Sequence, residues 1–89
     1  QDKLQDALEN VQMALDIDGT MAMAYNLKGL ILEKLNNLEE AIKSYEKGIR
    51  IIPADLYLNF NLAVAYFKNK EFNMAKEIFE KILTMNPDQ

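Results

Sequence analysis

The stretch EEAIKSYEKGIRIIP, residues 39–53, returns in outline as NMAKEIFEKILTMNP, residues 73–87. The two segments align without gaps at a shift of 34 residues. The matching pairs include Ala41 with Ala75, Tyr45 with Phe79 and Pro53 with Pro87. A fixed interval between matching residues indicates a chain built from repeated structural units. We therefore expect two complete units in this part of the chain.

The shift of 34 residues extends beyond these two segments. Upstream, Gly29 matches Ala63 and Leu38 matches Phe72, and one step further back the first residues of the chain match a partial unit. Within each unit the apolar residues recur three and four apart, as a helix packed on one face requires. Each complete unit is predicted to be a helical hairpin. The predicted division is a partial unit at residues 1–18 with a second helix only, complete units at 19–55 and 56–89, and no terminal capping helix.

Local signals predict where the helices end. Breaks are expected near residues 18–19, 36–37, 53, 69–70 and 87. Pro53 and Pro87 lack an N–H and disfavour a helical residue before them, so each should end the second helix of its unit.

Other residues are expected to cap the starts of helices. Asn37 is followed three residues later by Glu40, which predicts a capping box with the Asn side chain accepting from a first-turn amide. Thr20 and Asp55 precede the other two helix starts and are expected to cap them in the same way.

This period and pattern resemble the tetratricopeptide repeat. The residues that carry the resemblance are Tyr25, Gly29, Leu32, Leu38, Ala41, Tyr45 and Pro53 in one unit, and Leu62, Ala63, Tyr66, Phe72, Ala75, Phe79 and Pro87 in the next. The resemblance implies an all-α fold, an α-solenoid in which antiparallel helix-turn-helix units form a right-handed superhelix. The chain departs from the family's usual pattern at Lys28, Gly48, Asn59 and Ile82, where local packing is expected to differ.

Composition limits the classes of function. A hydrophobic share of 49% over 89 residues is enough for one small core, and the apolar runs are far shorter than the roughly 20 residues that cross a bilayer, so no membrane insertion is expected. The net charge of −4, with acids and bases interspersed, argues against a nucleic-acid partner. Gln1 stands where an initiating Met would, and no leader with a cleavage site follows, so we expect a fragment or a processed product.

The chain lacks two of the residue types that most often carry out catalysis. It contains no Cys and no His, which removes thiolate nucleophiles, the commonest general base and the commonest metal ligands. We expect no enzyme activity, no cofactor and no metal.

One short stretch, ALDIDGTM at residues 14–21, resembles the first motif of haloacid-dehalogenase-like phosphatases. The resemblance would make Asp16 the nucleophile and Asp18 the proton-transfer group. That motif needs a preceding apolar strand, whereas residues 4–17 carry helical spacing. In the 34-residue register Asp18 and Gly19 fall where the next units end. A helix end is therefore the favoured interpretation, and catalysis through the two Asp residues ranks behind every binding hypothesis.

The repeat resemblance also implies a concave face lined by the first helix of each unit. The family's groove positions correspond to Met23, Asn26, Leu30, Glu33 and Lys34 in the first complete unit and to Tyr57, Phe60, Val64, Phe67 and Lys68 in the second. The segment LYLNFNLAVAYFK, residues 56–68, is apolar on nearly every side, so its outer stripe needs a cover. That cover is either the chain's own side chains or a bound partner.

We expect the partner to be a protein or peptide with an apolar surface. The predicted binding residues are Met23, Asn26, Leu30, Tyr57, Phe60, Asn61, Val64, Phe67 and Lys68, with the aromatic residues and Val64 as anchors and the two Asn and Lys68 as polar guides. Some family members hold a C-terminal carboxylate with basic residues. The matching stripe here is Asn26, Leu30, Phe60 and Val64, so that ligand class is disfavoured.

The alternative function is assembly of copies of the chain. A second helix opens the chain without a first helix, and no helix follows the last one to cover Ile78, Ile82 or Met85. Terminal repeats with a polar outer face are normally needed for solubility. A homo-oligomer formed through these open ends is therefore also expected.

Overall fold

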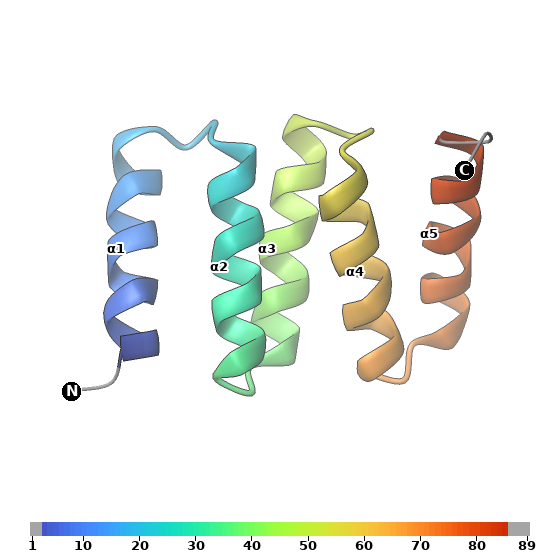
Figure 1. Cartoon of the computed structure of the whole chain (residues 1–89), viewed down its shortest axis with the longest axis horizontal. Helices are drawn as coiled ribbons and strands as arrows, with labels where there is room; N and C mark the ends of the chain where they lie inside the picture. The colour runs from blue at the N-terminus through green and yellow to red at the C-terminus, as the bar shows by residue number, and fades with distance from the viewer. Residues whose placement is uncertain (1–2, 86–89) are drawn as a thin grey trace.

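The computed structural model describes residues 3–85. Its helices are α1 (Lys3–Ile17), α2 (Ala22–Lys34), α3 (Leu38–Ile51), α4 (Leu56–Lys68) and α5 (Phe72–Met85). Figure 1 shows them side by side and alternating in direction, with α1 and α5 at opposite ends of the molecule. The predicted all-α fold of sequentially packed antiparallel helices is confirmed. In this described part of the chain, no helix combines the length and the apolar character that crossing a bilayer requires.

The core lies between successive helices and not at one centre, as stacking of units requires. The larger cluster joins α2, α3, α4 and α5, and its buried residues are Ala22, Leu32, Ala41, Ile42, Tyr45, Leu58, Leu62, Ala65, Tyr66 and Ala75. The smaller cluster joins α1 to α2 through Val11, Leu15, Ala24 and Ile31. Helix α2 also contacts α4 directly, so the first helices of the two complete units touch each other.

Small residues stand where the helices cross most closely. Ala41, Ala63 and Ala75 are buried, as is Gly29. A β-carbon at Gly29 would lie 2.3 Å from Cε1 of Tyr45, so the ring of Tyr45 occupies the space of a side chain at that position. Close helix approach of this kind needs a small residue at the contact.

Two helices of the array end with the same backbone motif. Asn36 and Lys70, which are 34 residues apart, both have left-handed backbone conformations with φ of 63° and 65°. After each one, the amide of the next residue returns to the helix, from Asn37 to Leu32 O at 2.8 Å and from Glu71 to Tyr66 O at 2.9 Å. This is the Schellman arrangement, which satisfies carbonyl groups at a helix end. The repeat therefore extends to the conformation of the turn.

The remaining helix ends lie near the predicted positions. Helix α1 ends at Ile17, directly before Asp18 and Gly19, and α3 ends at Ile51, shortly before Pro53. The break predicted at Pro87 lies outside the described residues.

Only one of the three predicted helix caps is present. Asp55 Oδ1 accepts a hydrogen bond from the amide of Leu58 at 2.9 Å, which confirms that cap. Asn37 makes no side-chain cap bond, so the predicted capping box is wrong. The prediction for Thr20 is also wrong, because α2 is preceded by Met21, and the Thr20 hydroxyl donates to Asp18 instead.

Two polar departures from the family pattern form hydrogen bonds. Half-buried Lys28 of α2 donates to Gln12 Oε1 of α1 at 2.5 Å. Asn59 is fully buried, and its Nδ2 donates to Pro53 O at 3.0 Å and to Asp55 O at 2.7 Å, which ties the α3–α4 connection to α4. Its Oδ1 is buried without a hydrogen-bond partner among residues 3–85. An unpaired buried acceptor costs about 1–3 kcal/mol. Asn59 therefore fixes the α3–α4 connection through its Nδ2 while its Oδ1 lowers the stability of the fold.

Candidate interaction surface

Helix α4 buries one side and exposes aromatic residues on the other. Its buried residues are Leu58, Asn59, Leu62, Ala63, Ala65 and Tyr66. Tyr57, Phe60 and Phe67 are 69%, 51% and 58% exposed, while Val64 is half-buried. The alternative that the chain's own side chains cover this stripe is therefore wrong for the three aromatic residues.

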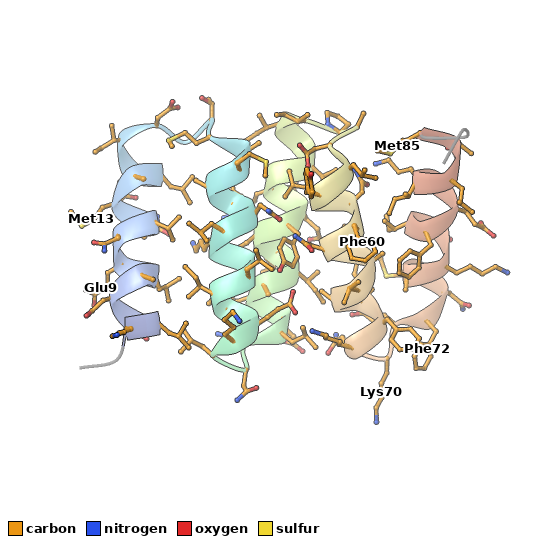
Figure 2. All side chains as sticks on the ribbon, in the orientation of Figure 1. Glu9, Met13, Phe60, Lys70, Phe72 and Met85 are labelled. Atoms are coloured by element: carbon orange, nitrogen blue, oxygen red, sulfur yellow. The ribbon has the colours of Figure 1, made fainter. Side chains whose placement is uncertain are left out.

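Two of these rings are held by aromatic residues of α5. Phe60 and Phe79 meet edge to face with ring centroids 6.2 Å apart, and Phe67 meets Phe72 in the same way at 5.2 Å. Figure 2 labels Phe60 on α4 and Phe72 at the start of α5. Edge-to-face pairs are a favoured aromatic geometry. We call Tyr57, Phe60, Phe67, Phe72 and Phe79 the aromatic surface.

The aromatic surface borders a pocket between α4 and α5 with a volume of about 320 Å³. The lining residues are Phe67, Phe72, Ala75, Lys76, Phe79, Glu80 and Leu83. Sequence reasoning used Phe72 and Phe79 only as repeat positions and missed them as surface residues. A signal was present, because the first complete unit has Leu38 where the second has Phe72.

The other predicted site residues do not share one hollow. Met23 lines a groove between α1 and α2. Leu30 and Lys68 line a separate depression of about 230 Å³ together with Glu33 and Lys34.

The two predicted amide guides bind each other. Asn61 Nδ2 of α4 donates to Asn26 Oδ1 of α2 at 2.7 Å, and Asn26 is buried. This bond crosses from one repeat unit to the next and fixes the position of α4 on α2. It leaves the second amide hydrogen-bonding group of each side chain, Nδ2 of Asn26 and Oδ1 of Asn61, without a bond to another described residue.

Lys68 takes part in a polar chain that joins three helices. Its Nζ lies 3.1 Å from Glu33 Oε1 of α2, and Glu33 Oε2 accepts a hydrogen bond of 2.5 Å from the Tyr45 hydroxyl of α3. The pKa of the Tyr45 hydroxyl is raised well above its ordinary value, mainly because the group is buried and secondly because it donates to the Glu33 carboxylate. Tyr45 is therefore held as a neutral donor, and Lys68 is engaged within the chain.

A similar hydrogen bond joins α4 to α3. The Tyr66 hydroxyl donates to Glu46 Oε2 at 2.6 Å. Burial, the hydrogen bond to Glu46 and the charges of Glu46 and Glu71 raise the pKa of Tyr66.

Asp16 and Asp18 lie at the end of α1 and the turn after it. Asp16 is in the last turn of α1, and its Oδ1 accepts from Gln12 Nε2 at 2.9 Å. Asp18 Oδ1 accepts from both the hydroxyl and the amide of Thr20, and these bonds lower the pKa of the Asp18 carboxyl. This is a local turn stabilised by its own side chains, which confirms the helix-end interpretation.

Exposed apolar residues also occur on the two outer helices. Met13 and Ile17 of α1 are 62% and 86% exposed, and Figure 2 shows Met13 on the side of α1 that points away from α2. On α5 the exposed large apolar residues are Phe72, Met74 and Leu83, whereas the three residues that were expected to lack a covering helix are only partly exposed. Those residues are Ile78, Ile82 and Met85, and of the three Ile78 packs against the larger core cluster.

Comparisons with known proteins agree with this architecture. Residues 1–89 match the family model described as the tetratricopeptide repeat protein 21 C-terminal ARM domain. The chain is 34% identical over 77 residues to a TPR repeat-containing protein of Methanocaldococcus jannaschii, covering 86% of the chain and 13% of that relative. It is 32% identical over 82 residues to tetratricopeptide repeat protein 21A of Mus musculus, covering 91% of the chain and 6% of that relative. The chain thus spans a small part of the length of these relatives.

The fold is also similar to solved structures. A crystal structure of MamA superposes with a TM-score of 0.91 at 28% sequence identity, covering 97% of the chain and 50% of the MamA chain. A second MamA crystal structure gives a TM-score of 0.88 at 28% identity and covers 97% of the chain and 47% of that one. The five helices among residues 3–85 correspond to about two and a half repeat units, and the chain belongs to the tetratricopeptide repeat family, in the group described as the C-terminal ARM domain of tetratricopeptide repeat protein 21.

Proposed function

We propose that this chain is a non-catalytic protein interaction module that binds an apolar peptide or helix of a partner protein on its aromatic surface. The observation that carries the proposal is the exposure of Tyr57, Phe60 and Phe67 on one stripe of α4. Aromatic residues are enriched at protein interfaces and often supply most of the binding energy. Tetratricopeptide repeat domains generally serve as interaction modules.

The α4/α5 pocket offers a place for one apolar side chain of the partner. Its rim carries one charge of each sign, Lys76 and Glu80, while its walls include Phe67 and Phe79. Burying an exposed Phe against a ligand contributes about 1.5–3 kcal/mol. Association itself costs several kcal/mol. A ligand held by two or three such contacts should therefore bind weakly, with a Kd of about micromolar at best.

Polar groups beside the aromatic stripe would orient the ligand backbone. Asn26 Nδ2 and Asn61 Oδ1 are a donor and an acceptor without another described partner. A peptide unit carries the complementary acceptor and donor. In this proposal Leu30 and Val64 supply further apolar area, and Lys68 acts through its ion pair with Glu33, whereas Met23 lies in the groove between α1 and α2 and takes no part.

A capture experiment with matched variants tests this proposal. Phe60→Ala combined with Phe67→Ala removes two exposed rings, whereas Met13→Ala combined with Ile17→Ala removes comparable exposed apolar area from α1. We expect a partner captured from source lysate by the parent chain to be lost with the first variant and retained with the second. Circular dichroism of both variants shows that the fold is kept. Equal capture by the parent and the Phe variant would discard the aromatic surface as the binding face.

Self-association is the second candidate function, and exposed apolar residues on both outer helices favour it. Ile17 of α1 and Leu83 of α5 are 86% and 67% exposed. Equilibrium sedimentation over a range of concentrations tests it. A strict monomer at high concentration would remove this candidate without affecting the first.

A further inference from the structure

The turn between α1 and α2 contains Asp18 followed by Gly19, which the binding surface described above does not use. An aspartyl residue before a glycine can rearrange without an enzyme, because the backbone N of the glycine can attack the carboxyl carbon of the aspartyl side chain. Glycine leaves that nitrogen accessible and gives the backbone the freedom to close a ring. Figure 1 shows the α1–α2 connection at an edge of the molecule, outside the helical array.

Both reacting groups are accessible in this turn. The Asp18 carboxyl is exposed, and its described hydrogen bonds come only from Thr20, through the hydroxyl and through the amide at 3.0 Å. The Gly19 amide donates no hydrogen bond to another residue among residues 3–85. A β-carbon added at Gly19 would meet only Leu15 O, at 3.6 Å, so the space around this peptide unit is open.

The other Asp and Asn residues in the connections between helices lack one of these conditions. In the two Schellman turns, the amide after Asn36 donates to α2 at 2.8 Å and the amide after Asn69 donates to α4 at 3.0 Å. An amide held in this way cannot turn to attack without losing its hydrogen bond. Asn37 and Asp55 are each followed by a leucine, whose side chain crowds the nitrogen. Asp18 is thus the only such residue in the described connections that precedes a glycine with an unbonded amide.

We propose that Asp18 is a site of spontaneous isomerisation to isoaspartate, and that this change loosens α1 from α2. The backbone N of Gly19 gives up its proton and bonds to Cγ of Asp18, and that proton leaves with the carboxyl hydroxyl group as water. Water then adds to the main-chain carbonyl carbon of residue 18, and the bond from that carbon to N breaks. The chain now continues through Cβ and Cγ, its mass is unchanged, and water is the only other reactant. This inference is independent of the function proposed above.

The isomerised turn has a longer main chain. Cβ of residue 18 becomes a backbone atom, and the carboxyl group left on Cα loses the position from which Asp18 accepts its two bonds from Thr20. The backbone of α1 approaches that of α2 and of no other helix in the part of the chain that the structure describes. The effect of the altered turn is therefore concentrated on α1, while the contacts among α3, α4 and α5 are kept.

The side chain of Thr20 slows the reaction. Its hydroxyl, and secondly its amide, donate to Asp18 Oδ1 and lower the pKa of the carboxyl. The ionised carboxylate reacts less readily than the neutral acid, because an ionised oxygen is a poorer leaving group than a hydroxyl. Loss of the Thr20 hydroxyl should therefore accelerate isomerisation.

Incubation of the folded chain in water labelled with heavy oxygen tests the proposal. Each passage through the cyclic imide adds a labelled oxygen, and fragment-ion mass spectrometry locates it. We expect label at Asp18 to grow faster than label at Asn36 or Asn69. Denaturant releases the bonded amides that protect the two Asn residues, so the ratio of label at Asp18 to label at either Asn should fall in the unfolded chain.

Two substitutions should change the rate in opposite directions. Gly19→Ala should slow labelling of residue 18 at least about two- to fivefold, which corresponds to the extra backbone freedom of glycine. The fold should be kept, because the new β-carbon makes an ordinary contact with Leu15 O. Thr20→Val should raise the rate about two- to fivefold by removing a hydrogen bond to the carboxylate. Thr84→Val, which removes a hydroxyl from α5, is the matched control and should leave the rate unchanged.

Hydrogen exchange measures the structural consequence. The isomerised chain, separated from the parent by chromatography, should exchange the amides of α1 about fivefold faster, because the turn has lost hydrogen bonds. The amides of α4 and α5 should exchange at the parent rate. Circular dichroism melts of all variants show whether the helices are kept.

Separate results would overturn each part of the proposal. Equal or greater labelling of Asn36 or Asn69 in the folded chain would overturn the choice of site, and an unchanged ratio in denaturant would overturn protection by bonded amides. An unchanged rate in Gly19→Ala would exclude attack by the Gly19 nitrogen, and an unchanged rate in Thr20→Val would remove the role of Thr20. Equal exchange of α1 in the two forms would overturn the loosening of α1.

Discussion

The ring of Tyr45 lies against the backbone of Gly29, at a separation that leaves no room for a β-carbon. The atoms in the way are Cε1, Cδ1 and Cζ of a fully buried ring, which cannot turn aside as the end of a flexible side chain would. Gly29→Ala should therefore overpack the α2/α3 contact at a cost of about 1–3 kcal/mol. Better helix propensity returns up to about 1 kcal/mol. We expect a net loss of about 1–2 kcal/mol in urea unfolding.

Gly48→Ala is the control for this prediction. A β-carbon there would meet the methyl groups Cδ2 and Cδ1 of Leu58 at 2.8 and 3.0 Å, which can move by small rotations, and the backbone Ala22 O at a less severe 3.2 Å. The gain in helix propensity should nearly balance that cost, so stability should stay within about 0.5 kcal/mol. Equal losses for the two variants would contradict the role assigned to the Tyr45 ring.

Lys70→Gly should stabilise the chain. Lys70 has φ of 65°, and a left-handed conformation costs an ordinary L-residue about 1–2 kcal/mol. Gly removes that strain but has more freedom to lose on folding, so we expect a net gain of about 0.5–1 kcal/mol. The matched change Asn36→Gly should gain less, because Asn tolerates this conformation better. Thermal melts of both variants check the order, and the reverse order would argue against backbone strain as the cause.

Asp55→Ala should cost about 1 kcal/mol, because it removes the only side-chain bond to the first-turn amides of α4 that the structure describes. Asn37→Ala should change stability by less than about 0.5 kcal/mol, since Asn37 makes no cap bond. Chemical denaturation of the pair measures the contrast. Equal destabilisation by the two substitutions would mean that the Asp55 cap bond adds no stability beyond what Asn37 provides.

Stability should fall at alkaline pH. The pKa values of Tyr45 and Tyr66 are raised in the folded chain, so their contribution is fully present below the unfolded value of about 10 and is lost as the pH rises above it. Tyr45→Phe combined with Tyr66→Phe should flatten the decline seen in melts between about pH 9.5 and 11. Tyr57→Phe, which removes an exposed hydroxyl, is the control and should keep the parent slope. An unchanged slope in the double variant would contradict this assignment.

The repeat period predicted the fold because residues at matching positions make the same contacts in each unit. Ala41 and Ala75 are buried at equivalent crossings, and Asn36 and Lys70 turn the chain in the same way. Such features depend on neighbours within one hairpin, which the sequence brings together in a fixed register.

The site was less predictable because it depends on contacts between units. Asn26 and Asn61 are 35 residues apart, as are Glu33 and Lys68, and helical periodicity cannot tell whether such side chains face a ligand or each other. The cap predicted at Asn37 was wrong, because the backbone amide of Asn37 bonds back to Leu32 O of α2 while its side chain makes no bond to α3. Exposure of the α4 aromatic residues followed from the pattern, but their pairing with α5 did not.

The two side-chain bonds described between α2 and α4 differ in charge, so we expect them to respond differently to salt. The hydrogen bond between the side-chain amides of Asn61 and Asn26 involves no net charge. The pair of Lys68 and Glu33, seven residues further along both helices, is ionic and partly solvated. Added salt screens the second and hardly affects the first. The pitch between successive units should therefore open at one edge as ionic strength rises, and the curvature of a longer superhelix would follow the salt concentration of its surroundings.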